Sequence, residues 1–398
     1  MHSISNRAKS MRTTPIRMLM PLAKETKAKG IDVIPLNIGQ PDIETPKPVL
    51  DAIRNYDCKV LAYSPSQGED ILIEAFSRYY KNNSIELSEK EIVVTTSGSE
   101  ALFFAFLAVC DHGDEILVFE PFYANYNSIA IETGAKLVPV RTYAEEGFHL
   151  PTDESIEAVI TEKTRAILIC NPNNPTGTVY TSEELVRLGS IAKKHNIYLI
   201  SDEVYREFVY DGNTHKSIMS YPEFNECTIL VDSISKRYSA CGARIGLIAS
   251  HDQSIMSSAY KFAAARLSSP TFEQMGAVAG IGMDSSYFAP ILAEYQKRRD
   301  VLIKGIRNIP GAICEVPGGA FYCVVKLPVN NSENFAKWLL TDFNLNGQTI
   351  LIAPANGFYA TPGLGSDEVR LSYVIDSSKL ETAMKILGEA IKEYNKQV

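Results

Sequence analysis

The chain has 398 residues, of which 45% are hydrophobic and 22% charged, and its formal net charge is −8 at pH 7. That length exceeds one ordinary domain, and the composition is that of a globular protein. The acidic balance argues against a surface for nucleic acid or anionic membranes, and no segment approaches the ~20 apolar residues of a membrane span. The seven cysteines are scattered without a Cys-x-x-Cys pair. They favour reduced thiols in a cytoplasmic protein, without a metal site.

The middle of the chain alternates short apolar runs with longer helical patterns. The runs are 92–96, 115–119, 136–140, 166–170, 197–201, 228–232 and 245–249. They predict an α/β fold with a mostly parallel sheet of about seven strands covered by helices. Between them, 99–110 is apolar on every side and predicts a buried helix. The sequence from Thr181 to Glu184 is a capping box that predicts the start of another helix.

Beyond about residue 290 the pattern changes to that of a smaller α+β unit. Its expected elements are a charged helix over 294–307, strands within 319–326 and 368–374, and a terminal helix over 378–394. We expect the N-terminal segment to pack with this unit, because its loop-like end precedes the large unit. The predicted division is 1–47 for that segment, 48–290 for the large domain and 291–398 for the small domain.

The first candidate site follows a predicted strand, where residues 95–101 read TTSGSEA. A small-residue turn leads there into the buried helix. Backbone N–H groups, the hydroxyls of Ser97 and Ser99 and the positive end of the helix dipole would converge, which favours an anion such as phosphate. An ordinary serine N-cap explains the same pattern equally well.

Two further motifs follow the next predicted strands. Residues 171–177 read NPNNPTG, a rigid non-helical loop that either aims an asparagine amide at a ligand or is a turn required by the topology. Asp202 leaves the following strand at the edge where α/β sheets bind ligands, with Tyr205 three residues on. Together they could hold a cationic ring nitrogen and a phenolic oxygen, although an acid at this place is more often a helix N-cap.

The last motif, Ser233 to Tyr238, reads SISKRY and closes an apolar run, and Arg244 follows eight residues beyond Lys236. An amine at a buried strand end with cationic neighbours is suited to attack carbonyl carbon. Ser-x-x-Lys is also an acyl-transfer signature, but that chemistry needs Ser-Asp-Asn and Lys-Thr-Gly, and the chain contains neither. The hydrolase interpretation is therefore weak.

Four strand ends thus offer a phosphate cradle, an aimed amide, an acid with a tyrosine, and a lysine followed by an arginine. Pyridoxal phosphate needs phosphate donors, a carboxylate for its ring nitrogen, donors for its ring hydroxyl and a Schiff-base lysine. Any one element could arise by chance. Their combination predicts a site for this cofactor.

With these motifs the chain resembles the class I/II aminotransferases of pyridoxal-phosphate fold type I, the aspartate aminotransferase group. The resemblance runs from about Ile31 to Val374. Its motifs are NIGQPD at 37–42, YSPSQG at 63–68, SGSEA at 97–101, PFY at 121–123, NPNNPTG at 171–177, SDEVY at 201–205, SISK at 233–236 with Arg244, and VRLS at 369–372.

The resemblance implies a role for each matching residue. Lys236 would form the Schiff base and move the proton between the substrate Cα and the cofactor. Asp202 would keep the pyridine nitrogen protonated, Asn174 and Tyr205 would bond the ring oxygen, and Tyr123 would stack on the ring.

The resemblance also implies a phosphate site, a substrate site and an obligate homodimer. The phosphate group would be held by Ser97, Gly98, Ser99, Ser233 and Arg244, with Tyr63 from a second subunit. The substrate would meet Asn174, the backbone at Gly39, and Arg370, whose guanidinium suits the α-carboxylate.

The chain departs from the family pattern where the substrate side chain would bind. Ser99 stands where one branch of aspartate aminotransferases has a lysine for the distal carboxylate. Ile73 replaces the arginine often found after the Gly68 turn. Another branch uses an arginine from the partner subunit, and Arg266 could be that residue or a member of a structural ion pair. These departures leave the cofactor chemistry intact and put the side-chain preference in doubt.

The expected activity is therefore transamination between an α-amino acid and a 2-oxo acid, with aspartate and 2-oxoglutarate as the expected pair. A neutral or aromatic donor is the nearest alternative. A β- or γ-eliminating lyase or a cyclising synthase could share the lysine constellation. A cofactor-sensing transcription regulator would need a DNA-binding segment, and only about thirty residues precede the first motif.

Overall fold

The large sheet of the computed structural model, which describes residues 2–11 and 14–397, has seven strands in the order β2-β8-β7-β6-β5-β3-β4. The strands are β2 (Ile92–Thr95), β3 (Glu115–Glu120), β4 (Lys136–Arg141), β5 (Thr164–Cys170), β6 (Tyr198–Asp202), β7 (Thr228–Ser233) and β8 (Gly246–Ala249). Each predicted apolar run coincides with one strand. Strand β8 runs antiparallel to both neighbours, and the other pairs are parallel. The predicted mostly parallel α/β sheet is confirmed.

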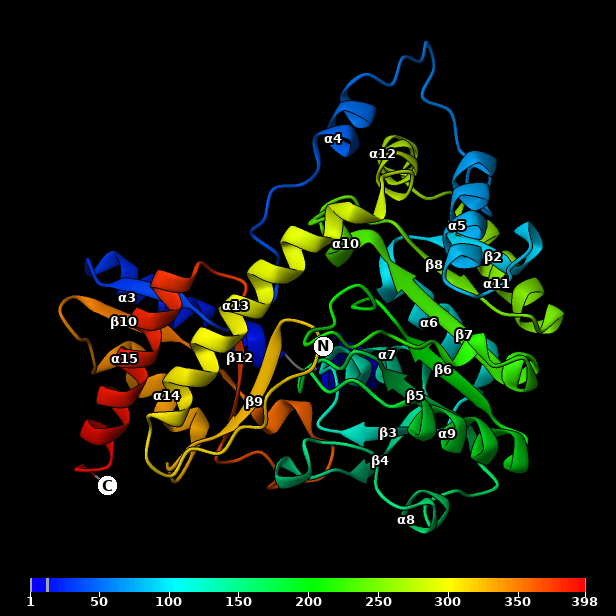
Figure 1. Cartoon of the computed structure of the whole chain (residues 1–398). Coiled ribbons are helices and arrows are strands. Elements are labelled where there is room, and N and C mark those ends of the chain that lie inside the picture. Colours follow the sequence, from blue (N-terminus) through cyan, green and yellow to red (C-terminus); the bar gives the residue numbers. More distant parts are fainter. Residues whose placement is uncertain (1, 12–13, 398) are drawn as a thin grey trace.

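Helices cover both faces of this sheet because its strands are apolar on both sides (Figure 1). On one face pack α6 (Ser97–Val109), α7 (Asn125–Thr133) and α11 (Gln253–Arg266). On the other pack α5 (Asp70–Asn82), α9 (Ser182–His195) and α12 (Thr271–Ile281). The predicted capping box is present at the start of α9, where Glu184 N donates to Thr181 Oγ1 at 3.2 Å and Thr181 N donates to Glu184 Oε2 at 2.8 Å.

The C-terminal part forms a second sheet, antiparallel in the order β11-β12-β9. Its elements are α13 (Phe288–Arg307), β9 (Tyr322–Lys326), α14 (Ser332–Thr341), β10 (Gln348–Leu351), β11 (Ala353–Pro354), β12 (Glu368–Ser372) and α15 (Ser377–Tyr394). Strand β1 (Asp32–Pro35) pairs in parallel with β10, and α3 (Met20–Ala28) packs on α14. The N-terminal segment therefore adds to the C-terminal unit.

One helix joins the two units. In Figure 1, α13 (yellow) runs from the side of the seven-stranded sheet toward α15 (red) in the C-terminal unit. The predicted boundary between residues 290 and 291 falls inside this helix. The division into residues 1–47, 48–290 and 291–398 stays a prediction.

The remaining elements are short. The α-helices are α1 (Asn6–Ser10), α2 (Pro15–Met18), α4 (Lys47–Arg54), α8 (Asp153–Glu157) and α10 (Ile234–Arg237). The 3-10 turns are η1 (Glu89–Glu91), η2 (Ala144–Glu146), η3 (Ile218–Ser220), η4 (Pro222–Cys227), η5 (Ser285–Tyr287) and η6 (Ala355–Phe358). Within residues 2–11 and 14–397, every helix is too short or too polar to span a bilayer.

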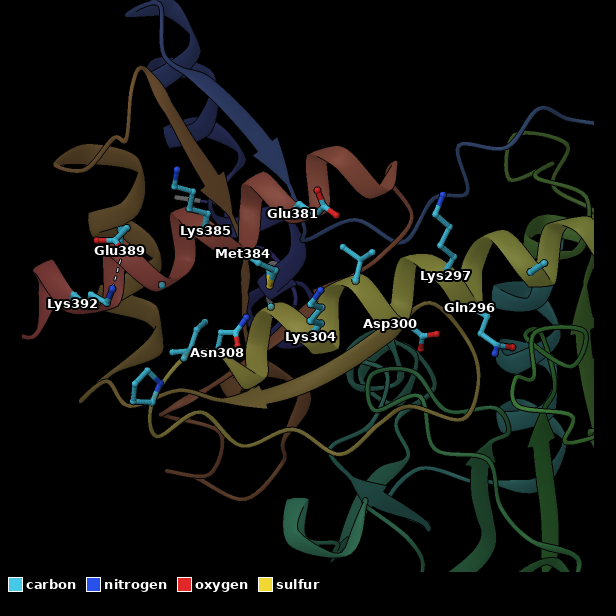
Figure 2. Close-up of a pocket in the computed structure, with 16 residues that line it drawn as sticks. Gln296, Lys297, Asp300, Lys304, Asn308, Glu381, Met384, Lys385, Glu389 and Lys392 are labelled. Carbon is cyan, nitrogen blue, oxygen red and sulfur yellow. Dashed lines mark hydrogen bonds and ion pairs between the residues drawn. The ribbon is translucent and has the colours of Figure 1, made fainter.

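The topology gathers the strand-end motifs. Strands β5, β6 and β7 are parallel neighbours that end at Cys170, Asp202 and Ser233. Their carboxyl ends therefore meet at one edge of the sheet, where α/β folds bind ligands. A separate groove lies between α13 and α15, lined by residues such as Lys304, Met384 and Lys385 (Figure 2). It belongs to the C-terminal unit and lies apart from this edge.

Candidate active site

Three serine hydroxyls converge where α6 begins. Ser97 Oγ lies 3.3 Å from Ser233 Oγ and 3.2 Å from Ser235 Oγ, and the last two oxygens are 2.8 Å apart. The backbone is closely packed here, since a Cβ at Gly246 would lie 2.8 Å from the nitrogen of Gly98. Hydroxyls, uncapped N–H groups and the positive end of a 13-residue helix make a cradle that fits a phosphate group.

Two predicted phosphate ligands stand apart from this cradle. The side chain of Ser99 is exposed. The guanidinium of Arg244 is also exposed, and its Nη1 donates to the carbonyl oxygen of Cys241 at 3.2 Å. Their roles toward phosphate stay predictions, whereas Ser97, Gly98 and Ser233 are brought together.

Asp202 is a buried carboxylate at the end of β6, 5% exposed. It accepts hydrogen bonds from Tyr126 Oη at 2.9 Å and from Val204 N at 3.3 Å. Burial raises the pKa of its carboxyl to about 6, and these hydrogen bonds oppose the rise. Among the residues that the structure describes, Asp202 forms no ion pair. A cationic ring nitrogen would supply the missing counter-charge.

Tyr205 of the large unit and Tyr322 of the C-terminal unit contact each other where the two units meet. Their hydroxyls are 2.9 Å apart and both side chains are buried. Tyr322 Oη also lies 3.4 Å from the carbonyl oxygen of Gly39. A Cβ at Gly39 would fall 1.7 Å from Tyr322 Oη, so the loop passes this hydroxyl at a distance that glycine permits.

Lys236 is half-buried on the one-turn helix α10. Its Nζ donates to the carbonyl oxygen of Gly39 at 2.9 Å and lies 3.7 Å from Cys241 Sγ. The predicted nucleophile therefore lies at the carboxyl edge of the sheet, next to the predicted substrate loop. Tyr123 is half-buried, and burial raises the pKa of its phenol to about 12, while the charges of Arg370 and Arg17 oppose the rise.

Arg370 on β12 is 1% exposed, although it lies at the predicted substrate site. Its Nη1 donates to Asn174 Oδ1 at 3.1 Å and its Nη2 donates to the carbonyl oxygen of Asn37. The guanidinium carbon lies 4.4 Å from the Tyr322 ring centroid. Within the described chain its buried Nε lacks a hydrogen-bond partner, and burial lowers the pKa of the guanidinium. A carboxylate would satisfy both the charge and the donor.

Two predicted residues lie elsewhere. Tyr63 is 80% exposed. Arg266 ends α11, where its Nε lies 3.3 Å from Glu100 Oε2 and its Nη2 donates to the carbonyl oxygen of Val94 at 3.0 Å. Within this chain, Arg266 is thus a member of an ion pair at the start of α6, and its role in substrate binding stays a prediction.

The sequence interpretation missed three site residues. Ser235 lies inside the SISK motif, and its alternation with Ser233 was the available signal. Tyr126 lies on α7, three residues after Tyr123, which precedes that helix, and the two ring centroids are 5.5 Å apart. Tyr322 had no local signal, because β9 reaches the site through the packing of the two units.

The hydrogen-bond donors and acceptors of this site match the polar groups of pyridoxal phosphate. The serine cradle suits the phosphate, buried Asp202 suits a basic ring nitrogen, and the Asn174 amide and Tyr205 hydroxyl can face a ring oxygen. Lys236 supplies an amine beside them. The unsatisfied Nε of Arg370 adds a carboxylate site on the same edge.

Comparisons with known proteins point to the same chemistry. Residues 31–387 match the family model for class I and II aminotransferases. The chain is 32% identical to an aspartate aminotransferase of Bacillus subtilis, covering 94% of this chain and 95% of the relative. It is 32% identical to a probable aspartate/prephenate aminotransferase of Aquifex aeolicus, covering 98% and 99%. The solved structure of an alanine aminotransferase from Pyrococcus furiosus superposes with a TM-score of 0.89 at 31% identity, covering 98% and 100%.

Proposed function

The chain belongs to the class I and II aminotransferase family, and on that premise we propose that it transfers the amino group of aspartate to 2-oxoglutarate. It is a pyridoxal-phosphate-dependent transaminase that acts on small molecules. The observation that carries the proposal is the meeting of Lys236, buried Asp202 and the unsatisfied Nε of Arg370 at one edge of the sheet. The names of the relatives in Bacillus subtilis and Aquifex aeolicus support aspartate as the donor.

In this proposal the large unit binds two charged groups of the cofactor, its phosphate and its ring nitrogen. The hydroxyls of Ser97, Ser233 and Ser235 and the start of α6 bind the phosphate. The carboxylate of Asp202 holds a proton on the ring nitrogen, because a buried anion without a protein cation strongly favours a cationic partner. Tyr126 keeps that carboxylate oriented through its 2.9 Å hydrogen bond.

Lys236 carries the reaction. When bound, the cofactor supplies a carbonyl carbon that takes the amino group and a ring that accepts electrons from the substrate Cα. The Lys236 amine would hold the bound cofactor at its carbonyl carbon, and it would take and return the proton at Cα. Its hydrogen bond to the Gly39 carbonyl keeps it beside the loop where the substrate enters.

Arg370 orients the substrate. Its contacts with Asn174 and the Asn37 carbonyl fix the guanidinium plane and leave Nε for the α-carboxylate. A charge-assisted contact at Nε fixes the position of the carboxylate and helps to fix the direction of the Cα–H bond. Because the arginine is buried beneath Tyr322, water is kept away from this contact.

Recognition of the substrate side chain has two cationic candidates. Arg266 is already paired with Glu100. Arg17 on α2 is exposed, and its charge acts on the phenol of Tyr123. The similarity to the alanine aminotransferase of Pyrococcus furiosus supports a neutral amino acid as the second proposed donor. A distal carboxylate would need one of these arginines, whereas alanine would need neither.

We propose a homodimer in which Tyr63 reaches the partner's site. Tyr63, Leu61 and Val60 are 80%, 62% and 77% exposed, an apolar group that a monomer would leave in water. Leu61 and Tyr63 line a surface hollow together with residues 268–273. Light scattering should give twice the chain mass of 44.0 kDa. The scattered reduced cysteines support a cytoplasmic location.

A panel of amino acids tests the reaction. The purified holoenzyme is mixed with one amino acid and no oxo acid, and its absorption is followed. Aspartate should convert the cofactor to its pyridoxamine form and release one equivalent of oxaloacetate per subunit. Release of pyruvate and ammonia would instead identify a lyase, and conversion by alanine but not aspartate would identify a neutral donor.

A further inference from the structure

A buried ionic cluster lies behind the cofactor site, on the sheet face that α5 covers. Its members are Tyr79, Tyr80, Glu203, Arg206, Glu207, Asp232 and Arg237. Asp232 and Glu203 are 0% exposed, Arg237 2% and Arg206 6%. Charges this deeply buried are costly unless they are paired, so mutual contact is what allows them here.

The cluster and the cofactor site share the same backbone. Three segments each give one residue to the site and the next residue to the cluster: Asp202 and Glu203, Tyr205 and Arg206, Lys236 and Arg237. Asp202 ends β6; Glu203, Tyr205 and Arg206 follow that strand, and Lys236 and Arg237 lie on α10. The cluster is therefore built on the same segments that carry the proposed chemistry.

Arg237 contacts three other members of the cluster, Asp232, Glu207 and Tyr79. Its Nη2 donates to Asp232 Oδ2 at 2.5 Å, and its Nε lies 3.2 Å from Glu207 Oε1. Its guanidinium carbon lies 4.4 Å from the ring centroid of Tyr79. Tyr80 Oη donates to the same Asp232 oxygen at 2.6 Å. Both side-chain oxygens of Asp232 are engaged, since Oδ1 accepts from the next backbone N–H at 2.6 Å.

These contacts bracket the helix that carries Lys236. Helix α10 has four residues, Ile234–Arg237. A single turn has little stability of its own, so its direction depends on what holds its ends. Asp232 holds the entry through the backbone, and Arg237 holds the exit through its side chain.

We propose that Arg237 is a positioning residue for Lys236: its pairing with Asp232 fixes the one-turn helix and neutralises a negative charge behind the cofactor. This inference rests on the proposed role of Lys236 as the lysine that carries the cofactor. It adds Arg237, a member of the buried cluster, to the residues proposed to position the reacting groups.

The charge of Asp232 acts on Asp202 in the cofactor site. It contributes to the raised pKa of Asp202, after the larger effect of burial. The titratable and charged groups that face Arg237 and Asp232 are Tyr79 and Tyr80 on α5, Glu203, Arg206, Glu207 and His215 after β6, and Tyr238 after α10. Without Arg237, Asp232 would be an unneutralised anion that favours positive charge at the Lys236–cofactor link.

The test compares Arg237→Met and Arg237→Lys with a matched control, Arg299→Met. Arg299 is 3% exposed, pairs with Asp211 at 2.5 and 2.8 Å, and lies 5.2 Å from the Tyr210 ring centroid. It is the same kind of buried, paired and stacked arginine, but it lies on α13. For each holoenzyme one measures kcat and KM for both substrates, the melting temperature, and the pH midpoint of the visible absorption change.

Arg237→Met should lower kcat about 10-fold or more, because a small displacement of a reacting group is costly, with a smaller change in KM. Its absorption midpoint should move to higher pH, and Arg237→Lys should restore most of both quantities. Arg299→Met should lower the melting temperature and leave kcat and the midpoint at wild-type values. Wild-type kcat and midpoint in Arg237→Met, or equal changes in Arg299→Met, would overturn the proposal.

Two further measurements keep the test decisive. If Arg237→Met does not fold, the near-isosteric Asp232→Asn takes its place and should move the midpoint to lower pH; an unchanged midpoint overturns the proposal. Borohydride reduction of wild-type holoenzyme and peptide mapping come first. A label on another lysine would refute the proposed function, whereas a label on Lys236 with unaltered variants would refute the role of Arg237 and leave the function standing.

Discussion

Asp202 and Glu203 are neighbours in the sequence but lie in two different charge environments. Asp202 accepts from Tyr126 and a backbone N–H, and within the described chain no cation pairs with it. Glu203 accepts from the hydroxyls of Ser201 at 3.0 Å and Ser217 at 2.6 Å, and Arg206 lies 3.8 Å away. Burial raises the pKa of Asp202 to about 6 and that of Glu203 to about 7.

This difference in charge balance distinguishes the face that would bind the cofactor from the face that supports the fold. On the Glu203 face the protein supplies its own cations, Arg206 and Arg237, which pair with Glu203 and Asp232. On the Asp202 face the charge balance awaits a cationic group from outside the chain. Replacing Glu203 should therefore act mainly on stability, and replacing Asp202 should act on the cofactor.

The largest expected effect is that of Lys236→Ala. Removing the amine takes away both the attachment point and the proton carrier, so multiple turnover should fall by about 10⁴-fold. Steady-state assay with aspartate and 2-oxoglutarate measures this. A variant that transaminates at the wild-type rate would refute the assignment of the whole site.

Asp202→Asn and Glu203→Gln compare the two faces directly. Asn keeps the shape but not the charge, so kcat should fall about 10²- to 10³-fold, as expected for the loss of a preorganised electrostatic contact. Glu203→Gln should lower the melting temperature and change kcat by less than about 3-fold. Equal losses of kcat in both variants would abolish the distinction between the faces.

The raised pKa of Asp202 predicts a pH dependence of stability in the apoprotein. The pKa is about 6 in the folded chain and 3.8 for an unperturbed aspartate, so between these values the folded chain binds more protons than the unfolded chain. The free energy of unfolding should then fall as pH rises through this window, by no more than about 3 kcal/mol. Urea titrations of apoprotein and apo Asp202→Asn at several pH values measure the difference. A contribution that rises with pH would contradict the proposed environment.

Arg370→Lys should separate substrate binding from cofactor binding. An ammonium cannot reproduce the forked contact, so KM for aspartate and 2-oxoglutarate should rise about 10- to 100-fold. Cofactor affinity should change much less, since Arg370 meets the proposed cofactor ligands only through Asn174 Oδ1. A loss of cofactor with unchanged KM would show that the arginine belongs to the cofactor site.

The smallest expected effect concerns the two arginines considered for the distal carboxylate. Arg17→Met should raise KM for aspartate relative to alanine by about 2- to 5-fold, the range of an exposed ion pair. Arg266→Met should lower the melting temperature, because Glu100 and the Val94 carbonyl lose a partner. A selective loss of aspartate activity in Arg266→Met would assign the distal site to that residue instead.

The sequence predicted what depends on local pattern. The seven strands were found from their apolar runs, and α9 from the Thr181 capping box, because these signals lie within a few residues. The clustering of Ser97 with Ser233 was implied by the family resemblance. The exposed place of Arg244 and the pairing of Arg266 with Glu100 were open, since side-chain direction depends on tertiary neighbours.

The contributions from distant segments could not be predicted. Tyr322 reaches Tyr205 from 117 positions away, and Tyr80 reaches Asp232 from 152 positions away. Neither pair has a periodic signature. The buried ionic cluster was hidden for the same reason, because its residues lie in motifs whose other members drew the functional interpretation.

Nitrogen-15 NMR of holoenzyme loaded with ring-labelled pyridoxal phosphate tests the difference between the two faces most directly. The chemical shift of the ring nitrogen reports whether it is protonated. A protonated nitrogen in the wild type and in Glu203→Gln, and loss of that proton in Asp202→Asn at neutral pH, is the predicted result. A nitrogen that stays protonated in Asp202→Asn, or loses its proton in Glu203→Gln, would contradict it.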